Sequence, residues 1–95
     1  MLTKIKKIKV KHFGHKREFS LESVYINSNN IISISNYENL QEFLITENSK
    51  LAGEDFSLIK IQEGAQVEDL IVLGSAEAVF SDIKKQQKGK DILNG

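Results

Sequence analysis

The chain has 95 residues, of which 40% are hydrophobic and 27% are charged, and these proportions fit one small globular domain rather than a disordered tail or a membrane protein. It contains no cysteine, which excludes a disulfide framework, a thiolate nucleophile and a zinc–thiolate site. Lysines interrupt the N-terminal stretch where a secretory signal needs an uninterrupted apolar core, so we expect a cytoplasmic protein.

The formal net charge of zero conceals a segregation of charge along the chain. Residues 1–17 carry seven basic side chains and no acid, residues 18–83 carry twelve acids and two lysines, and residues 84–95 carry four lysines and one aspartate. The seven are the candidate binding residues for a nucleic acid or an acidic partner: Lys4, Lys6, Lys7, Lys9, Lys11, Lys16 and Arg17. A basic strand lying beside acidic ones explains the same pattern, and both interpretations stay open at this point.

The N-terminal segment predicts a β-hairpin. Apolar residues and lysines alternate through residues 3–13, with the period of a strand that has one face in water. Gly14 separates this strand from a second one that ends at 26. The hydrophobic phase of the second strand changes between Leu21 and Val24, which indicates a bulge or a break near Ser23.

The segment that follows is rich in asparagine. Residues 27–30 predict a turn, because asparagine tolerates left-handed backbone and bonds to nearby backbone groups. Residues 31–37 predict a strand with Ile32 and Ile34 on one face and Ile31 on the other.

Residues 38–57 leave two alternatives open. Leu40, Phe43 and Leu44 fit one face of a short helix, whereas FLIT fits a strand. The acidic stretch ENSKLAGED after them is typical of a mobile loop.

The C-terminal part predicts a hairpin and then a helix. The strand LIKIQ is followed by a hairpin turn at Glu63 and Gly64 and then by VEDLIVLG, in which residues 70–73 suit a strand that is buried on both faces. The helix is expected over residues 76–87, with the motif GSAEAVFSDIKKQQKG carrying its start and stop signals. Gly89 is the expected stop, and we expect one domain over residues 1–89 with a frayed tail at 90–95.

Gly74 and Ser75 mark the start of this helix, and backbone N–H groups there attract anions. A phosphate-binding loop needs several glycines at set spacing, and Glu77 opposes an anion. We therefore interpret Ser75 as an N-cap and Glu77 as a charge that favours the helix dipole.

The catalytic and metal-binding patterns are weak. His12, His15 and Glu18 form HxxHxxE, which has the ligand types of a zinc or iron site, but the spacing suits a helix and the flanks predict strands. No serine stands in a G-x-S-x-G elbow, and the neighbouring carboxylates Glu54–Asp55 and Glu68–Asp69 fall in predicted turns. We expect no enzyme activity, no metal and no cofactor.

The basic N-terminal strand has two interpretations. Alternating lysines could follow the phosphates of a single-stranded nucleic acid, with Phe13 or Tyr25 as a stacking surface. Against this, the segment holds only one arginine, which is the favoured reader of bases, and the acidic middle of the chain repels a polyanion. The alternative is an edge strand that lysines protect against aggregation.

The segments VYINSNNIISIS, LIKIQEG and LIVLGSAEAVFSDIK, which fall within residues 24–85, together resemble the small FlbD-type proteins of bacterial flagellar operons and similar short phage proteins. The insertion at 38–57 and the basic N-terminal arm depart from that family's pattern. The resemblance implies a noncatalytic cytoplasmic accessory or regulatory role and carries over no binding residue.

We therefore predict a small α+β domain, in which one C-terminal helix covers a mostly antiparallel sheet of about five strands. In the predicted core, Val79, Phe80 and Ile83 pack on Ile32, Ile34, Ile59, Ile61, Ile71 and Leu73. Because the core is thin, we expect self-association through an exposed face or edge. The expected function is a noncatalytic regulatory or adaptor role through protein–protein contacts, and the alternative is a nucleic-acid-binding regulator that uses the basic N-terminal segment.

Overall fold

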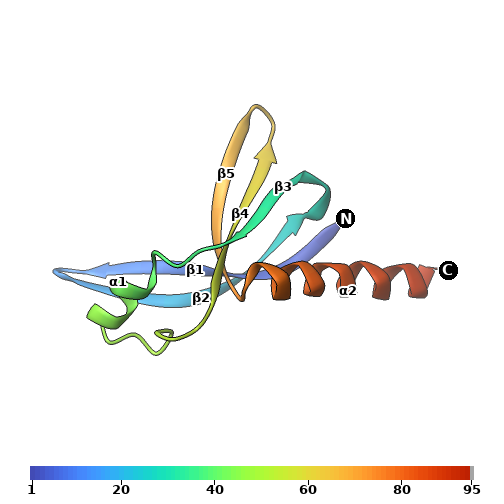
Figure 1. The fold of residues 1–95 in the computed structure, drawn as a ribbon. Helices are drawn as coiled ribbons and strands as arrows, with labels where there is room; N and C mark the ends of the chain where they lie inside the picture. Colours follow the sequence, from blue (N-terminus) through green and yellow to red (C-terminus); the bar gives the residue numbers. More distant parts are fainter. Residues whose placement is uncertain (95) are drawn as a thin grey trace.

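The structure, a computed structural model, describes the backbone of residues 1–94 and the side chains of residues 1–88. Five strands form one antiparallel sheet in the order β2-β1-β5-β4-β3, with α2 packed on it, which confirms the predicted small α+β fold (Figure 1). The elements are β1 (Leu2–Phe13), β2 (Lys16–Asn27), a 3-10 helix (Ser28–Asn30), β3 (Ile31–Asn36), α1 (Gln41–Thr46), β4 (Phe56–Glu63), β5 (Gln66–Leu73) and α2 (Ala76–Asn94). Within the described residues, no helix combines the length and the apolar composition needed to cross a membrane.

β1 and β2 form a long hairpin. Their register runs without interruption from the pair Leu2 and Asn27 to the pair Phe13 and Lys16. Gly14 begins the two-residue turn with a φ of 60°, in the left-handed region that favours glycine. The predicted hairpin is therefore confirmed, and its strands are about twice as long as an average strand.

The β1–β2 and β4–β5 hairpins meet at one place and then diverge. β1 pairs with β5 only at Lys7 and Val72, and Figure 1 shows the two hairpins running in different directions from there. Beyond this point, Gln86 of α2 takes the place of a neighbouring strand: the Lys4 N–H donates to Gln86 Oε1 at 3.0 Å, and Gln86 Nε2 donates to the Lys4 carbonyl at 2.9 Å. One side-chain amide thus satisfies both backbone groups of Lys4.

The first core lies between one face of the sheet and α2. Its centre is Ile59, which is fully buried, and Val79 and Ile83 cover it from the helix. The remaining buried members are Ile5, Ile26, Ile61, Leu70 and Val72.

The second core lies on the opposite face of the sheet. Leu40 and Leu44, from the segment around α1, pack there with Phe56 of β4. Successive residues of a strand point to opposite faces, so Leu70 and Val72 enter the first core while Ile71 and Leu73 pack on the second. This arrangement confirms the prediction that residues 70–73 are covered on both faces, whereas residues 66–69 of β5 are exposed.

The bulge predicted near Ser23 is wrong, because the β1–β2 register passes through Ser23 without a shift. The hydrophobic phase changes for another reason. Near its open end the hairpin places Ile5 and Val24 against the first core, and further along it places Ile8 and Phe19 against the second core, on the other face. The apolar face of the hairpin therefore switches sides while its backbone stays regular.

The predicted orientation of β3 and part of the predicted core are also wrong. The register of β3 against β4 shifts between Ile31 and Ser33, so Ile31 and Ile34 both pack on the first core and Ile32 is exposed. Phe80 is exposed as well. Ile71 and Leu73 belong to the second core rather than to the predicted one.

Of the two alternatives for residues 38–57, the structure has the helix, α1. The turns that follow α1 are fastened to it by Gln41, whose side chain accepts a hydrogen bond from the Gly53 N–H at 3.1 Å and donates to the Glu54 carbonyl. Leu51 packs against the second core, so the acidic segment has an apolar anchor.

α2 is longer than the predicted helix over 76–87, because its bounds are Ala76–Asn94. A glycine inside a helix costs only about 1 kcal/mol relative to alanine and does not by itself end the helix. The predicted fraying of 90–95 concerns residues whose side chains lie outside the described part of the chain, and it stays a prediction.

Candidate interaction surfaces

At the Gly74–Ser75 corner, capping side chains occupy backbone N–H groups that could otherwise bind an anion. The Ala76 N–H donates to Asn36 Oδ1 at 2.8 Å, and the Ala78 N–H donates to Ser75 Oγ at 3.2 Å. Side chains of the protein thus occupy donors that an anion would use, which confirms the N-cap interpretation.

The structure separates the three residues of HxxHxxE. His12 lies opposite Arg17 in the hairpin, His15 lies in the turn, and Glu18 lies opposite Lys11 on the other face. Among the described residues, no group of three histidine, aspartate or glutamate side chains is placed to hold a metal ion.

Four of the seven predicted binding residues share one face of the hairpin, three on β1 and Lys16 on β2. Lys7, Lys9 and Lys11 alternate along β1 with residues of the other face, beyond the part that packs on the first core. We define the open hairpin face as these lysines, Phe13, and the residues opposite them on β2, namely Glu22, Ser20, Glu18 and Lys16. It is basic on β1 and mixed on β2, because Glu22 lies directly opposite Lys7 and Glu18 lies directly opposite Lys11.

Lys4 and Lys6 are not part of this surface. They alternate with it along β1 and line a cavity of about 460 Å³ between β1 and α2, together with Asp82 and Gln86. The predicted set of basic residues is therefore divided between the two faces of the β1–β2 hairpin.

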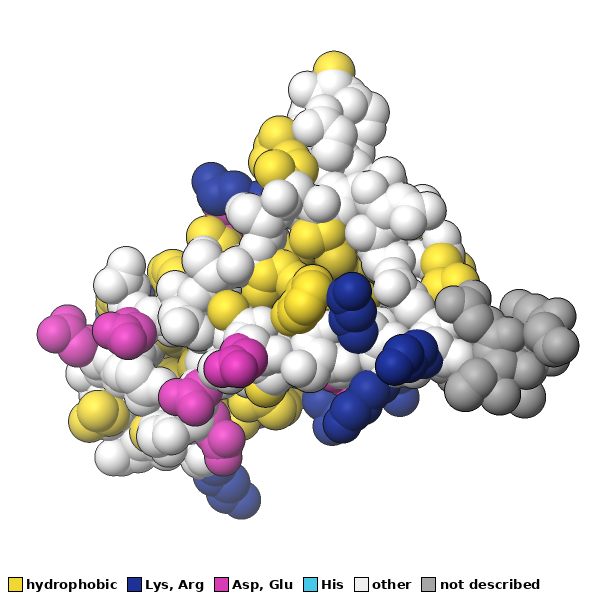
Figure 2. Space-filling model, turned by 45° about the vertical axis from the view of Figure 1, so that its right-hand side comes forward, with side chains coloured by type: hydrophobic (Ala, Val, Ile, Leu, Met, Phe, Trp, Pro, Cys, Tyr) yellow, Lys and Arg dark blue, Asp and Glu magenta, His cyan; other side chains and the backbone are white. Residues whose placement is uncertain are grey.

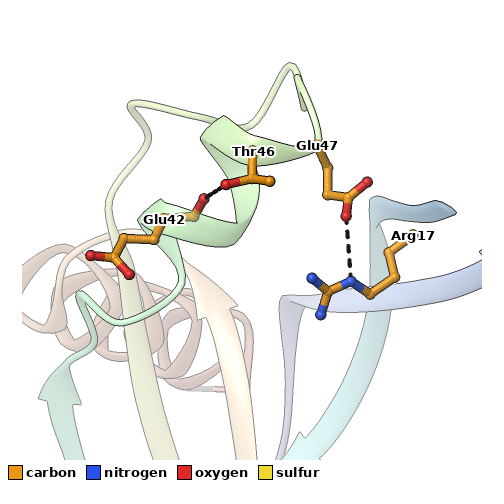
Figure 3. Close-up of polar contacts among 4 residues, drawn as sticks. All are labelled: Arg17, Glu42, Thr46 and Glu47. Carbon is orange, nitrogen blue, oxygen red and sulfur yellow. Dashed lines mark hydrogen bonds and ion pairs between the residues drawn. The ribbon is translucent and has the colours of Figure 1, made fainter. Parts of the chain in front are cut away.

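Arg17 acts within the protein. Its Nε lies 3.5 Å from Glu47 Oε1, and its guanidinium lies 4.9 Å from the centre of the Phe43 ring (Figure 3). Thr46 Oγ1 donates to the Glu42 carbonyl at 2.8 Å in the last turn of α1. Arg17 therefore attaches α1 and the residue after it to the hairpin.

The interpretation that a basic strand lies beside acidic ones predicts ion pairs between the N-terminal lysines and Glu63, Glu68 or Asp69. Among the described residues, no such ion pair is present. Asp69 lies instead 4.0 Å from Lys60 Nζ, on the neighbouring strand β4. This is a contact within the β4–β5 hairpin and involves no N-terminal lysine.

A groove of about 570 Å³ runs between the start of β3 and the exposed side of α2, and we call it the β3–α2 groove. Ile32 forms one wall and is 54% exposed, and Phe80 forms the other and is 52% exposed. Lys84 Nζ lies 5.3 Å from the centre of the Phe80 ring. Glu77, Lys84 and Gln87 of α2 and Ser28 and Ser33 supply polar groups.

Figure 2 shows hydrophobic side chains gathered at the centre of one face of the molecule. A group of lysines lies to the lower right of this patch, and most of the acidic side chains in this view lie to its lower left, with single basic side chains at the upper left and at the bottom. The face therefore has an apolar centre with charged side chains of both signs around it.

Comparison with protein-family models, with curated proteins and with solved structures found no match for this chain. The FlbD-type resemblance accordingly stays a prediction, and the function is argued from the surfaces alone.

Sequence reasoning missed the groove because it placed both Ile32 and Phe80 in the core. Nothing in the hydrophobic pattern of β3 marks the register shift. A signal was present in α2, since Phe80 shares a helix face with Glu77 and Lys84, three residues before it and four after it. An aromatic residue between two charged ones on a helix face indicates a surface rather than a core.

Proposed function

We propose that the protein is a noncatalytic regulatory or adaptor protein that acts through protein–protein contacts in the cytoplasm. The β3–α2 groove is the observation that carries this proposal. A phage or bacterial accessory role, as in the FlbD-type resemblance, fits such a function.

The groove has the composition of a contact surface. An exposed aromatic side chain and an exposed isoleucine both line it, together with charged and polar groups. Protein interfaces combine an apolar, aromatic centre with a polar rim in the same way. Exposure of two large apolar side chains in one groove costs solubility, and a bound protein removes that cost.

The test is site-specific photo-crosslinking in cells that produce the protein. A benzophenone amino acid replaces Phe80 in one variant and Val67 in the control, because Val67 is exposed to the same extent but lies on β5, outside the groove. We expect discrete protein adducts from position 80, identified by mass spectrometry, and none from position 67. Equal labelling at both positions, or none at position 80, would refute the groove as a protein contact surface.

A second candidate function is nucleic-acid binding by the open hairpin face. The observation that favours it is the row of Lys7, Lys9 and Lys11, which ends at Phe13 with 58% of its surface exposed. Such a row offers cations for phosphates and a ring for stacking on a base. Glu18 and Glu22 on the neighbouring strand weaken the attraction.

The two faces of β1 provide a matched test of this candidate. Labelled single- and double-stranded DNA and RNA are titrated at two salt concentrations with the wild type, with Lys7→Gln/Lys9→Gln/Lys11→Gln and with Lys4→Gln/Lys6→Gln. Binding that weakens with salt and is lost mainly in the triple variant supports the open hairpin face. Equal loss in both variants indicates general charge attraction, and absence of binding at low salt removes the candidate.

A further inference from the structure

We infer that the occupant of the β3–α2 groove is a second copy of this chain, held by antiparallel pairing of the two α2 helices. The inference rests on the proposed function, because it requires the groove to be a protein contact surface, and it names the partner.

One face of α2 carries the residues that the pairing would use. Glu77, Phe80 and Lys84 follow one another at spacings of three and four, so they form one stripe along the helix. Val79 and Ile83 point instead into the first core. The stripe borders the groove, and within it the Lys84 ammonium lies over the Phe80 ring.

The order of charges in the stripe is self-complementary. In a two-fold dimer, each contact between residue i and residue j occurs twice, once in each direction. We place the two-fold axis perpendicular to the paired antiparallel helices, at the level of the midpoint between Phe80 and Ser81. Glu77 of each copy then lies opposite Lys84 of the other. The axis also places the two Phe80 rings side by side at the centre, next to Ile32 on the wall of the groove.

Other arrangements match the groove less well. Parallel pairing would set Glu77 against Glu77 and Lys84 against Lys84, which is repulsive. An acidic partner would be repelled at the Glu77 end of the groove, and a basic partner at the Lys84 end. A second copy in antiparallel orientation satisfies both ends at once, and it covers the apolar centre that one copy leaves in water.

The experiment uses the purified full chain alone, in sedimentation velocity over a wide concentration range. We expect the wild type to reach twice the mass of one chain. Glu77→Lys and Lys84→Glu each replace both opposite-charge contacts by like-charge contacts, so each should raise the dissociation constant roughly tenfold or more. An equimolar mixture of the two variants restores opposite charges at both contacts, and it should dimerise with about the wild-type affinity.

The mixture also serves as the folding control, since misfolded variants would not rescue each other. Glu68→Lys and Lys50→Glu make the same changes in net charge at exposed positions outside the groove, and they should leave the dissociation constant unchanged.

A wild type that stays monomeric at every concentration overturns the inference, as does a dimer that neither groove variant weakens. If the wild type is monomeric and the benzophenone at position 80 still captures a different protein, the groove has another partner and the proposed function stands. If no adduct forms at position 80 either, both fail.

Discussion

Gly74 stands where β5 ends and α2 begins, and two features of its geometry exclude other residues. Its φ is 110°, a conformation that side chains of L-residues rarely adopt, and a Cβ there would lie 3.2 Å from Cγ2 of Val79 in the first core. We expect Gly74→Ala to lower the free energy of unfolding by about 1–3 kcal/mol, because the backbone strain and the tight contact add. Urea unfolding followed by circular dichroism measures the change.

Gly64→Ala is the control for that substitution. Gly64 begins the β4–β5 turn with a φ of 59°, and a Cβ there would meet nothing within 4 Å. It should cost about 1 kcal/mol, from backbone strain alone. Equal losses in the two variants would show that the contact with Val79 contributes nothing.

Thr3 is the opposite case, because its buried hydroxyl lowers the stability of the fold instead of supporting it. It is fully buried, and its hydroxyl has no hydrogen-bond partner among the described residues. Valine has nearly the same shape and no polar atom to desolvate, so Thr3→Val should raise the free energy of unfolding by about 1 kcal/mol. A loss of stability in urea unfolding would show that the hydroxyl has a partner in solution, such as a buried water.

At the scale of elements, α1 is attached to the rest of the protein by Leu44, its one buried residue, and by the contacts with Arg17. Leu44 is fully buried in the second core, whereas Phe43 next to it is 46% exposed and lies under Arg17. We expect Leu44→Ala to destabilise the protein by about 2–5 kcal/mol, since it leaves a cavity. Phe43→Ala should cost clearly less, because half of that ring is already in water.

Chemical denaturation of the two variants under identical conditions measures the difference. A loss in Phe43→Ala that equals the loss in Leu44→Ala would mean that the contact between Phe43 and Arg17, rather than burial, holds α1 in place.

The strands and α2 were predictable because their patterns are local. Alternation in β1 is enough to place Lys7, Lys9 and Lys11 on one face, and the capping role of Ser75 follows from its place before an amphipathic segment. These features depend on neighbours in the sequence, so the sequence alone predicts them.

The remaining features depend on contacts between distant segments. The register shift in β3 exposes Ile32, and Arg17 finds Glu47 only after α1 folds over the hairpin. The β3–α2 groove needs both elements in place. A pattern of apolar positions does not state which of two faces is covered, so the pattern indicates a bulge near Ser23 where the protein has a second core on the far side of the sheet.

At the scale of the whole molecule, two small cores share one sheet, and neither is large enough to stand alone. β5 contributes Val72 to the first core and Ile71 to the second, and the β1–β2 hairpin also contributes to both. Loss of one core therefore removes support from the other, so we expect the protein to unfold in one cooperative transition.

The chain contains no tryptophan, and Tyr37 packs against the second core while Tyr25 is exposed. Tyrosine fluorescence should therefore follow the unfolding of the second core. Far-ultraviolet circular dichroism should follow mainly the unfolding of α2, which covers the first core. Coincident midpoints in urea support a single transition. Two separated midpoints would mean that the cores melt independently.

The change of apolar face in the β1–β2 hairpin also helps to fix the register of its two strands, the longest in the protein. A slip of one residue turns every side chain of a strand to the opposite face. In a hairpin with one apolar face, a slip disturbs one core. Here it would withdraw Ile5 from one core and Ile8 from the other in the same step. The phase change that the sequence presents as a bulge thus favours one alignment of the hairpin, because a misaligned pairing loses contacts on both sides of the sheet.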